Sequence, residues 1–374
     1  MRKTFFALAL LVIGAPIYAQ IVVSTFEDID TLFIDDAIIF DEEGNLYGSH
    51  FEGSRVYKIS PDGTASVFAD DLVSPNGMTF DSFGNLHLAD FSGNKVYRID
   101  PSGVKTELIP SIHRPSGALK RPDSDTVLIS RYFADIILKV APDGNIDTLA
   151  EGDLLNGPVG MIYDEEDELY VGNFDDRRII HLLEDGSQSE LAQIPGPGVL
   201  GFIAYDDGIF YGTAYNGAKV YQVRKSDSLV SILAGTTVGE TDGDTSVAQF
   251  NRPNGICMSP TKDSIFVSDY STGNVRIISG FKSVGLFNIK LKEFSVFPNP
   301  AKNQINIHLN LSDARKVQLQ LLNSFGQSVH SEVIGDVNGE VSQILAIPNV
   351  AQGIYTLHLS FEEENYFKQI FISP

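Results

Sequence analysis

The stretch PNGMTFDSFGNLHLADFSGNKVYRIDPSGVKTELI, residues Pro75–Ile109, decides the fold because it is one copy of a unit that the chain repeats six times. A second clear copy is Ala37–Asp70, AIIFDEEGNLYGSHFEGSRVYKISPDGTASVFAD. The same register runs through Leu46, Leu86, Val127, Leu169, Ile209 and Ile265, in steps of 40 to 42 residues and a last step of 56. A period near forty residues, with apolar runs separated by turn residues, predicts the blades of a β-propeller.

Each unit is expected to form four short strands, named a to d in chain order. In the copy quoted first, these are Gly77–Phe80, Leu86–Ala89, Lys95–Ile99 and Val104–Ile109. β-Branched and apolar residues dominate the runs, and Gly- and Asp-containing turns join them. No later stretch has a sustained 3.6-residue apolar period, so we expect very little helix.

The two ends of the repeat region have separate roles. Residues 1–19 combine Arg2 and Lys3 with a short apolar core and a small residue, Ala19, which predicts a secretory signal peptide. Its apolar run is too short for a permanent membrane span, and no other stretch is long enough, so we expect no transmembrane segment. The segment Ile21–Phe26 has no strand a before it, and we expect it to close the ring as the outer strand of blade six.

The last eighty residues depart from the repeat. From Phe294 onward, apolar and polar residues alternate in runs of five to eight, which predicts a small β-sandwich at residues 294–374 after a linker at 281–293. Pro298-Asn299-Pro300-Ala301, Leu321–Val329 with Gly326, Gly353-Ile354-Tyr355 and Lys368–Ile372 resemble the C-terminal sorting domain of type IX secretion cargo. The resemblance implies handling by the type IX machinery and a protein that is secreted or attached to the cell surface. The alternative is an adhesive or spacing sandwich.

Charge and cysteine content narrow the function classes. The net charge is −22, and almost all of it falls on residues 20–290, so we expect no nucleic-acid partner. The single cysteine, Cys257, excludes an intrachain disulfide and is expected to be a small buried apolar residue.

The repeat units of residues 20–280 resemble the NHL-type propeller and its relatives in the senescence-marker-protein and gluconolactonase-like group. The sixth unit carries the resemblance best, through Pro253-Asn254-Gly255-Ile256, Ile265–Asp269 and Val275–Ile278. The expected architecture is therefore all-β: a six-bladed propeller at 20–280 followed by a small C-terminal sandwich.

Blade geometry places two sets of residues at one mouth of the central channel, because the residue before strand a and the residue after strand b meet on one face. The first ring is predicted as Asp36, Asn76, Ser116, Val159, Gly201 and Asn254. The second ring is predicted as His50, Asp90, Arg131, Asn173, Thr213 and Asp269. Polar groups that converge in this way mark the default ligand site of a propeller.

Asp36, Asn76 and Asn254 are consecutive around the ring and offer oxygen ligands suited to a divalent cation, most naturally Ca²⁺. The gluconolactonase-like relatives hold a catalytic metal with such residues, and the resemblance implies a metal that polarises a lactone and activates water. This chain departs from them, since it has no Glu before the first strand a and no tryptophan. The alternative is that both Asn residues occupy turns because Asn tolerates left-handed geometry.

In the second ring, Asp90 and Asp269 are expected to bind turn amides, whereas His50, Arg131 and Asn173, with Ser116 of the first ring, are candidate ligand contacts. His50 is the candidate general base. Phe51, Phe91, Tyr132, Phe174 and Tyr270 follow in five of the six blades, and packing between blades is favoured over stacking on a sugar. No nucleophile elbow, zinc motif or phosphate loop is present.

Two functions remain open at this point. One is a surface propeller that binds a small molecule, carbohydrate or protein at the channel mouth. The other is a divalent-metal-dependent hydrolase of lactones.

Overall fold

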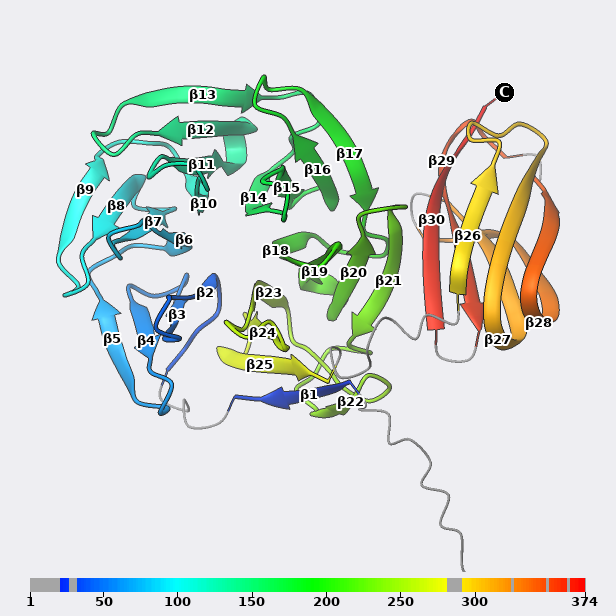
Figure 1. Ribbon diagram of the computed structural model, residues 1–374, viewed down its shortest axis with the longest axis horizontal. Coiled ribbons are helices and arrows are strands. Elements are labelled where there is room, and N and C mark those ends of the chain that lie inside the picture. Colours follow the sequence, from blue (N-terminus) through cyan, green and yellow to red (C-terminus); the bar gives the residue numbers. More distant parts are fainter. Residues whose placement is uncertain are drawn as a thin grey trace, which may run out of the picture.

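The computed structural model describes residues 21–26, 32–280, 291–323, 326–347, 350–361 and 364–373. Six antiparallel sheets stand around a common axis, and a further stack of strands continues one of them (Figure 1). In the described part of the chain the only helical elements are two 3₁₀ turns, η1 (Tyr132–Ala134) and η2 (Tyr215–Gly217). The six-bladed, all-β prediction is therefore confirmed.

The first three blades each have four strands in chain order from the axis outward. Blade one contains β2 (Ile38–Phe40), β3 (Leu46–Ser49), β4 (Val56–Ile59) and β5 (Ala65–Ala69). Blade two contains β6 (Pro75–Phe80), β7 (Leu86–Asp90), β8 (Lys95–Ile99) and β9 (Lys105–Ile109). Blade three contains β10 (Pro115–Lys120), β11 (Val127–Arg131), β12 (Ile136–Val140) and β13 (Ile146–Glu151).

The next two blades repeat this order. Blade four contains β14 (Pro158–Tyr163), β15 (Leu169–Asn173), β16 (Arg178–Leu182) and β17 (Gln188–Gln193). Blade five contains β18 (Leu200–Asp206), β19 (Ile209–Ala214), β20 (Lys219–Arg224) and β21 (Leu229–Ala234).

Blade six is built from both ends of the repeat region. It contains β23 (Pro253–Met258), β24 (Ser264–Asp269) and β25 (Asn274–Ser279), with β1 (Val22–Thr25) and β22 (Gly243–Asp244) outside them. β1 pairs antiparallel with β25 from Val22↔Ser279 to Thr25↔Arg276, which confirms that the Ile21–Phe26 segment closes the ring. The hydroxyl and amide of Thr25 both donate to the Asp242 carboxylate, at 3.0 Å each.

The innermost strands pack directly on one another between blades. The Ser130 hydroxyl of blade three accepts the Gly117 amide at 2.7 Å and donates to the Val159 carbonyl of blade four at 3.3 Å. Ser268 of blade six does the same for Gly255 and the Asp36 carbonyl of blade one, at 2.8 and 2.6 Å. These hydroxyl bridges fix the ring of strand-a residues at the channel mouth.

The outer strands differ in a way that matters at blade five. β5, β9, β13 and β17 each expose two or three consecutive residues and carry polar or charged side chains, as expected for solvent-facing strands. By contrast β21, Leu-Val-Ser-Ile-Leu-Ala, is apolar on both faces and almost wholly buried. An apolar outer strand of this kind requires a cover.

The C-terminal strands form that cover. They are β26 (Leu291–Phe297), β27 (Gln304–Leu322), β28 (Ser328–Ala346), β29 (Gly353–Phe361) and β30 (Glu364–Ile372). The first half of β27 pairs with β26 and its second half with β29, while β28 follows it along most of its length. The faces enclose one apolar cluster that includes Phe294, Ile307, Leu319 and Leu357, which is the core of the predicted sandwich.

β30 adds to the edge of blade five. It pairs antiparallel with β21 through Val230↔Phe367 and Ser231↔Tyr366. Leu229 of the propeller is buried in the sandwich core, and Phe367 of the sandwich is buried with Val230 among residues of blades four and five. Each domain thus contributes one apolar side chain to the core of the other.

Three smaller predictions can be placed. The predicted signal peptide and residues 281–290 of the predicted linker lie outside the described residues. Cys257 is half-buried rather than fully buried, and its side chain packs against the cluster that contains Phe40 and Phe266. Within the described residues, no helix has the length and apolar character that crossing a membrane requires.

Candidate functional site

The predicted first ring lies at the start of the innermost strands, which surround the axis in Figure 1. Its polar members Asp36, Asn76, Ser116 and Asn254 are all buried, with exposed fractions of 3, 6, 1 and 8%. They are held there because each lies at or beside the start of a strand a whose backbone is bonded to the neighbouring strand b.

Asp36 and Asn254 lie in contact across the joint between blades one and six. The Asn254 Nδ2 group donates to Asp36 Oδ1 at 2.8 Å. Asn76 donates through Nδ2 to the Ser116 hydroxyl of blade three at 3.3 Å, and its buried Oδ1 has no hydrogen-bond partner. The structure therefore arranges these four side chains as two adjacent pairs.

The alternative explanation of Asn76 and Asn254 as turn residues is wrong. Both lie inside strands, β6 and β23, and neither has a positive φ. The left-handed residue near the start of strand β23 is Arg252, with φ 64°, and it precedes Pro253. The two Asn side chains are thus not required by the local backbone geometry.

Two neighbouring carboxyl groups share this part of the mouth. Burial raises the pKa of Asp35 to about 7, although its carboxylate accepts the Phe51 amide at 2.6 Å. Burial, followed by the nearby charge of Asp35, raises the pKa of Asp36 well above its usual range. Of the described basic side chains, only His50 lies within ion-pair distance of either carboxylate, 3.9 Å from Asp35.

A divalent cation would depend on few charged ligands here. In the described part of the chain, no three His, Cys, Asp or Glu side chains gather as a metal site. The donors that fit are oxygen atoms: the Asp36 carboxylate, the unpartnered Asn76 Oδ1 and, after rotation of its amide, Asn254 Oδ1. This donor set suits a hard cation bound mainly by neutral oxygens.

The second ring needs one correction, in blade five. The ladder pairs Leu200 with Ala214, just as it pairs Pro75 with Asp90 and Pro253 with Asp269. Ala214, rather than Thr213, is therefore the counterpart of Asp90 and Asp269 at the end of strand b. Thr213 instead donates to the Asn254 carbonyl at 2.6 Å and bridges blades five and six.

Asp90 has the structural role expected of it. Its carboxylate accepts the amides of Val73, Ser74 and Gly93, the last at 3.2 Å in the turn after strand b. Asp269 accepts the Asn251 amide at 3.1 Å and faces the buried Arg276 guanidinium at 3.4 Å. Neither carboxylate is available to a ligand.

The other second-ring residues lie in different surroundings. Asn173 is fully buried and donates to the Leu154 carbonyl at 2.7 Å, while its Oδ1 lacks a partner. Arg131 is half-buried and donates to the His113 carbonyl at 3.4 Å. His50 is half-buried beside Phe33, with ring centroids 4.9 Å apart, and burial lowers the pKa of its imidazole.

An aromatic residue follows strand b in all six blades, not five. Sequence reasoning missed Tyr215 because Ala214 interrupts the polar pattern one residue before it. We define the aromatic collar as Phe51, Phe91, Tyr132, Phe174, Tyr215 and Tyr270. Neighbouring members contact one another at centroid distances between 5.3 and 6.3 Å.

The collar confirms that these rings pack between blades, and it leaves each ring only half-buried. The Tyr270 hydroxyl donates to the Glu52 carboxylate next to Phe51, which connects the two ends of the series. The channel mouth therefore has a polar, buried inner ring and an aromatic, half-exposed outer ring.

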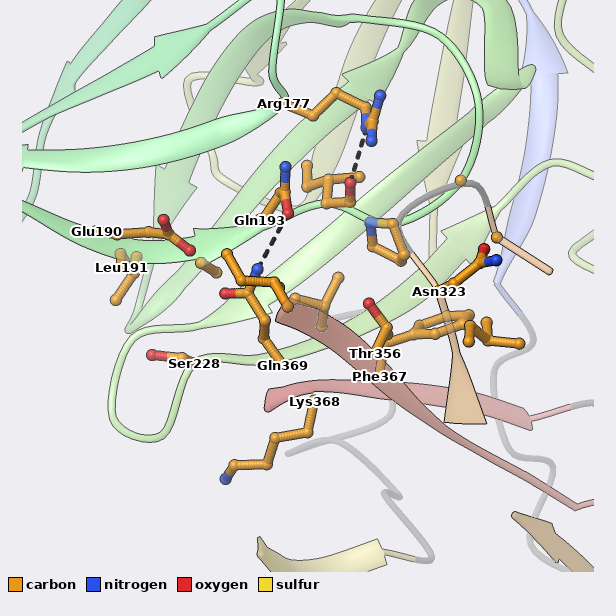
Figure 2. A pocket seen from close by; sticks show the side chains of 18 residues that line it. Arg177, Glu190, Leu191, Gln193, Ser228, Asn323, Thr356, Phe367, Lys368 and Gln369 are labelled. Carbon is orange, nitrogen blue, oxygen red and sulfur yellow. Dashed lines mark hydrogen bonds between the residues drawn. The ribbon is translucent and has the colours of Figure 1, made fainter. Parts of the chain in front are cut away.

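A cavity of about 410 Å³ lies elsewhere, where blades four and five meet the sandwich (Figure 2). Its polar lining is largely engaged: Arg177 donates to the carbonyls of Ile194 and Gly198, and Gln369 donates to Gln193 at 3.1 Å across the seam. Lys368 donates to the Phe294 carbonyl at 2.9 Å. We interpret this cavity as a gap in the domain interface rather than as the ligand site.

Comparison with known proteins identifies the C-terminal domain and the fold of the rest. Residues 295–373 match the family of secretion system C-terminal sorting domains. No curated protein matches the chain.

Solved structures match the propeller at low identity. An auxiliary nutrient-binding protein from Bacteroides thetaiotaomicron superposes with a TM-score of 0.61 at 14% identity, over 70% of this chain and 76% of that one. A gluconolactonase from Xanthomonas campestris gives 0.57 at 15% identity, over 71% and 92%. Virginiamycin B lyase from Staphylococcus aureus gives 0.52 at 15% identity, over 70% and 99%. At these identities the likeness is one of fold.

Proposed function

We propose that this chain, a six-bladed propeller joined to a secretion-system C-terminal sorting domain, is exported by the type IX machinery and binds a small ligand at the channel mouth that carries Asp36. The observation that carries the proposal is the inner ring of buried polar side chains, one of which, Asn76, keeps an unpartnered oxygen. A buried polar atom without a partner is costly, and a ligand that satisfies it recovers that cost.

The likeness to an auxiliary nutrient-binding protein supports the binding function over a purely structural one. The sorting domain supports a place outside the cell or on its surface. Export through a signal peptide at residues 1–19 is part of the proposal.

The test is a thermal-shift screen of the purified full chain against sugars, lactones, amines and divalent cations, repeated with Asp36→Asn. A ligand that raises the melting temperature of the wild type and leaves the variant unchanged supports the site. Exposed Asp62→Asn, on a c–d turn at the opposite face, is the matched control and should respond as the wild type does. A ligand whose shift survives Asp36→Asn binds elsewhere and contradicts the proposal.

A second candidate function is hydrolysis of a lactone with a divalent cation. The likeness to a gluconolactonase and the oxygen set of Asp36, Asn76 and Asn254 favour it. A bound cation would supply polarisation of the lactone carbonyl and a more acidic water. His50 is the candidate base, because the low pKa of its imidazole keeps it neutral near pH 7.

The two functions separate in one measurement. Hydrolysis of glucono-δ-lactone followed by pH-stat, with Ca²⁺ and with chelator, should show calcium-dependent turnover only if the chain is an enzyme. His50→Gln should then lose most of that turnover while binding remains. No turnover above the uncatalysed rate leaves the binding function.

A further inference from the structure

The rings of the aromatic collar are steeply inclined to one another. If the rings lay flat across the mouth, neighbouring planes would be nearly parallel, whereas upright rings turn with their blades by about 60° in a six-bladed propeller. The observed angles between neighbouring planes are 52, 62, 82, 51 and 68°. The six rings therefore form a wall around the mouth rather than a lid over it.

The size of this wall suits a single charged group on the axis. In a six-fold ring, the distance from the axis to each centroid equals the spacing between neighbours. The five measured spacings, between 5.3 and 6.3 Å, correspond to a ring radius of about 6 Å, which is the outer limit for cation–π attraction. Several rings at once can therefore attract one cation.

The collar already holds positive groups of the protein. The Arg114 guanidinium lies 4.9 Å from the centre of Phe91, and that of Arg252 lies 5.7 Å from Tyr215. Among the contacts of the described residues, no Lys or Arg lies over Phe51, Tyr132, Phe174 or Tyr270.

Two hydroxyl contacts strengthen the negative character of the rim. Tyr132 donates to Asp175 at 2.6 Å, and Tyr270 donates to Glu52. These bonds fix the two phenol rings and place an exposed carboxylate beside each of them.

The inner ring offers acceptors to whatever enters the collar. Asp36 is buried, and in the described part of the chain its carboxylate accepts one hydrogen bond, from the Asn254 amide. Asn76 Nδ2 donates one bond to the Ser116 hydroxyl, and Oδ1, an acceptor, is the side-chain atom of Asn76 that has no partner. A ligand that complements this ring must bring N–H or O–H donors. A charged donor also favours the ionised form of Asp36, whose pKa burial raises, and it then binds more strongly than a neutral donor.

We propose that the ligand of the channel mouth is a protonated primary amine, whose ammonium group passes through the aromatic collar and donates to Asp36 and Asn76. This inference rests on the proposed binding function and names its ligand class. The large negative charge of the chain would raise the local concentration of such a cation at the surface.

The test uses three probes of similar size on the purified full chain: butylamine, tetramethylammonium and 1-butanol, each titrated by calorimetry at pH 7.5. Butylamine carries charge and donors, tetramethylammonium carries charge alone, and 1-butanol carries a donor without charge. We expect butylamine to bind at least tenfold more tightly than 1-butanol, with tetramethylammonium between them.

Variants assign the contributions to the two rings. Phe174→Leu should lower the affinity for both cations by about threefold to tenfold, within the range of a cation–π contact. Asn76→Leu should weaken the binding of butylamine and leave the affinity for tetramethylammonium unchanged. Phe83→Leu, 77% exposed on an a–b turn at the opposite face, is the matched aromatic control and should change nothing.

Opposite results overturn the inference. Equal affinity for butylamine and 1-butanol would show that charge is not recognised. Binding of Ca²⁺ or a sugar that depends on Asp36, without binding of either ammonium probe, would overturn the ligand class and leave the proposed site standing. If no probe and no screened ligand binds at the mouth, both the ligand class and the proposed binding site are wrong.

Discussion

At the scale of the residue, Gly117 shows how closely the blades approach at the axis. A Cβ at this position would lie 1.9 Å from the Val159 carbonyl oxygen and 2.9 Å from the Ser130 hydroxyl. Because the first obstacle is backbone of the next blade, it cannot move aside as a flexible side chain would.

We expect Gly117→Ala to destabilise the propeller by about 3 kcal/mol or more, since the added methyl forces two blades apart. The measurement is the free energy of unfolding from urea denaturation. Gly353→Ala in strand β29 is the control, because a Cβ there would meet nothing nearer than 4.0 Å. An equal effect of both substitutions would contradict the close-packing argument.

His87 is a second residue whose burial has a measurable consequence. Its imidazole is 2% exposed and contacts Asp81 at 3.0 Å, and burial lowers its pKa despite that carboxylate. A histidine with a lowered pKa in the folded state stays neutral there, while the unfolded chain takes up a proton near pH 6.5. The contribution of His87 to the free energy of unfolding is thus complete above pH 6.5 and is lost as the pH falls below that value.

We expect the melting temperature of the wild type, relative to His87→Gln, to fall by about 2 °C or more between pH 7.5 and pH 5, the change that roughly 1 kcal/mol produces. Differential scanning calorimetry at several pH values measures it. His113→Gln, at an exposed position, is the matched control. A difference that stays constant with pH would contradict the assignment.

At the scale of the element, strand β1 closes the ring by pairing with β25. Val23 is fully buried in the core between blades five and six, whereas Val22, one residue earlier in the same strand, is 38% exposed. The two side chains point to opposite faces, so the same substitution at each tests the closing strand with its own control.

Val23→Asp should destabilise the ring by about 3 kcal/mol or more, because it buries a charge against apolar neighbours. Val22→Asp should stay within about 1 kcal/mol of the wild type. Removal of Ile21–Phe26 should be at least as damaging as Val23→Asp, because it frees the edge of β25. An unchanged melting curve for the deletion would contradict the closure.

The strands were predictable because each blade repeats its pattern of apolar runs and turns. The closing strand was predictable for a simpler reason: Ile21–Phe26 resembles a strand d without the strands before it. The error at Thr213 arose where polarity was used as a substitute for register. In blade five the counterpart of Asp90 is the apolar Ala214, and Thr213 is only its polar neighbour one position earlier.

The candidate site was predictable in position and less so in contacts. Strand order alone places Asp36 and Asn254 side by side. It does not reveal that Asn173 is used by the Leu154 carbonyl, or that Asn76 keeps an unpartnered oxygen, since both depend on side-chain rotamers in a packed ring.

At the scale of the whole molecule, the sorting domain is docked rather than loosely attached. The apolar strand β21 signalled this in the sequence, since Leu229–Ala234 carries no charge, unlike strands d of most other blades. Which segment covers it could not be read from the sequence, because β30 is more than a hundred residues away and pairs through only two positions.

Phe367→Ser should undock the sandwich, because Phe367 is the sandwich side chain that is buried among residues of blades four and five. Small-angle X-ray scattering should then show a larger radius of gyration with both domains folded. Phe297→Ser, in the same domain and more than half exposed, should leave the scattering unchanged. A compact Phe367→Ser variant would contradict the docking.

Deletion of residues 294–374 should leave the chain in the periplasm, since the sorting domain addresses it to the secretion machinery. Cell fractionation with surface protease treatment measures this. The Phe367→Ser variant, which keeps the domain, should still reach the surface. Surface exposure of the deleted chain would contradict the role of the domain.

The pairing of β30 with β21 is shorter than the pairing that closes the ring, so the two should differ in mechanical strength. A pull on the sorting domain loads two residue pairs at blade five, whereas the ring is closed by four pairs between β1 and β25 and by two more with β22. The pairing between β21 and β30 should therefore separate before the pairing between β1 and β25. The domain can be drawn away under tension while the propeller behind it stays shut.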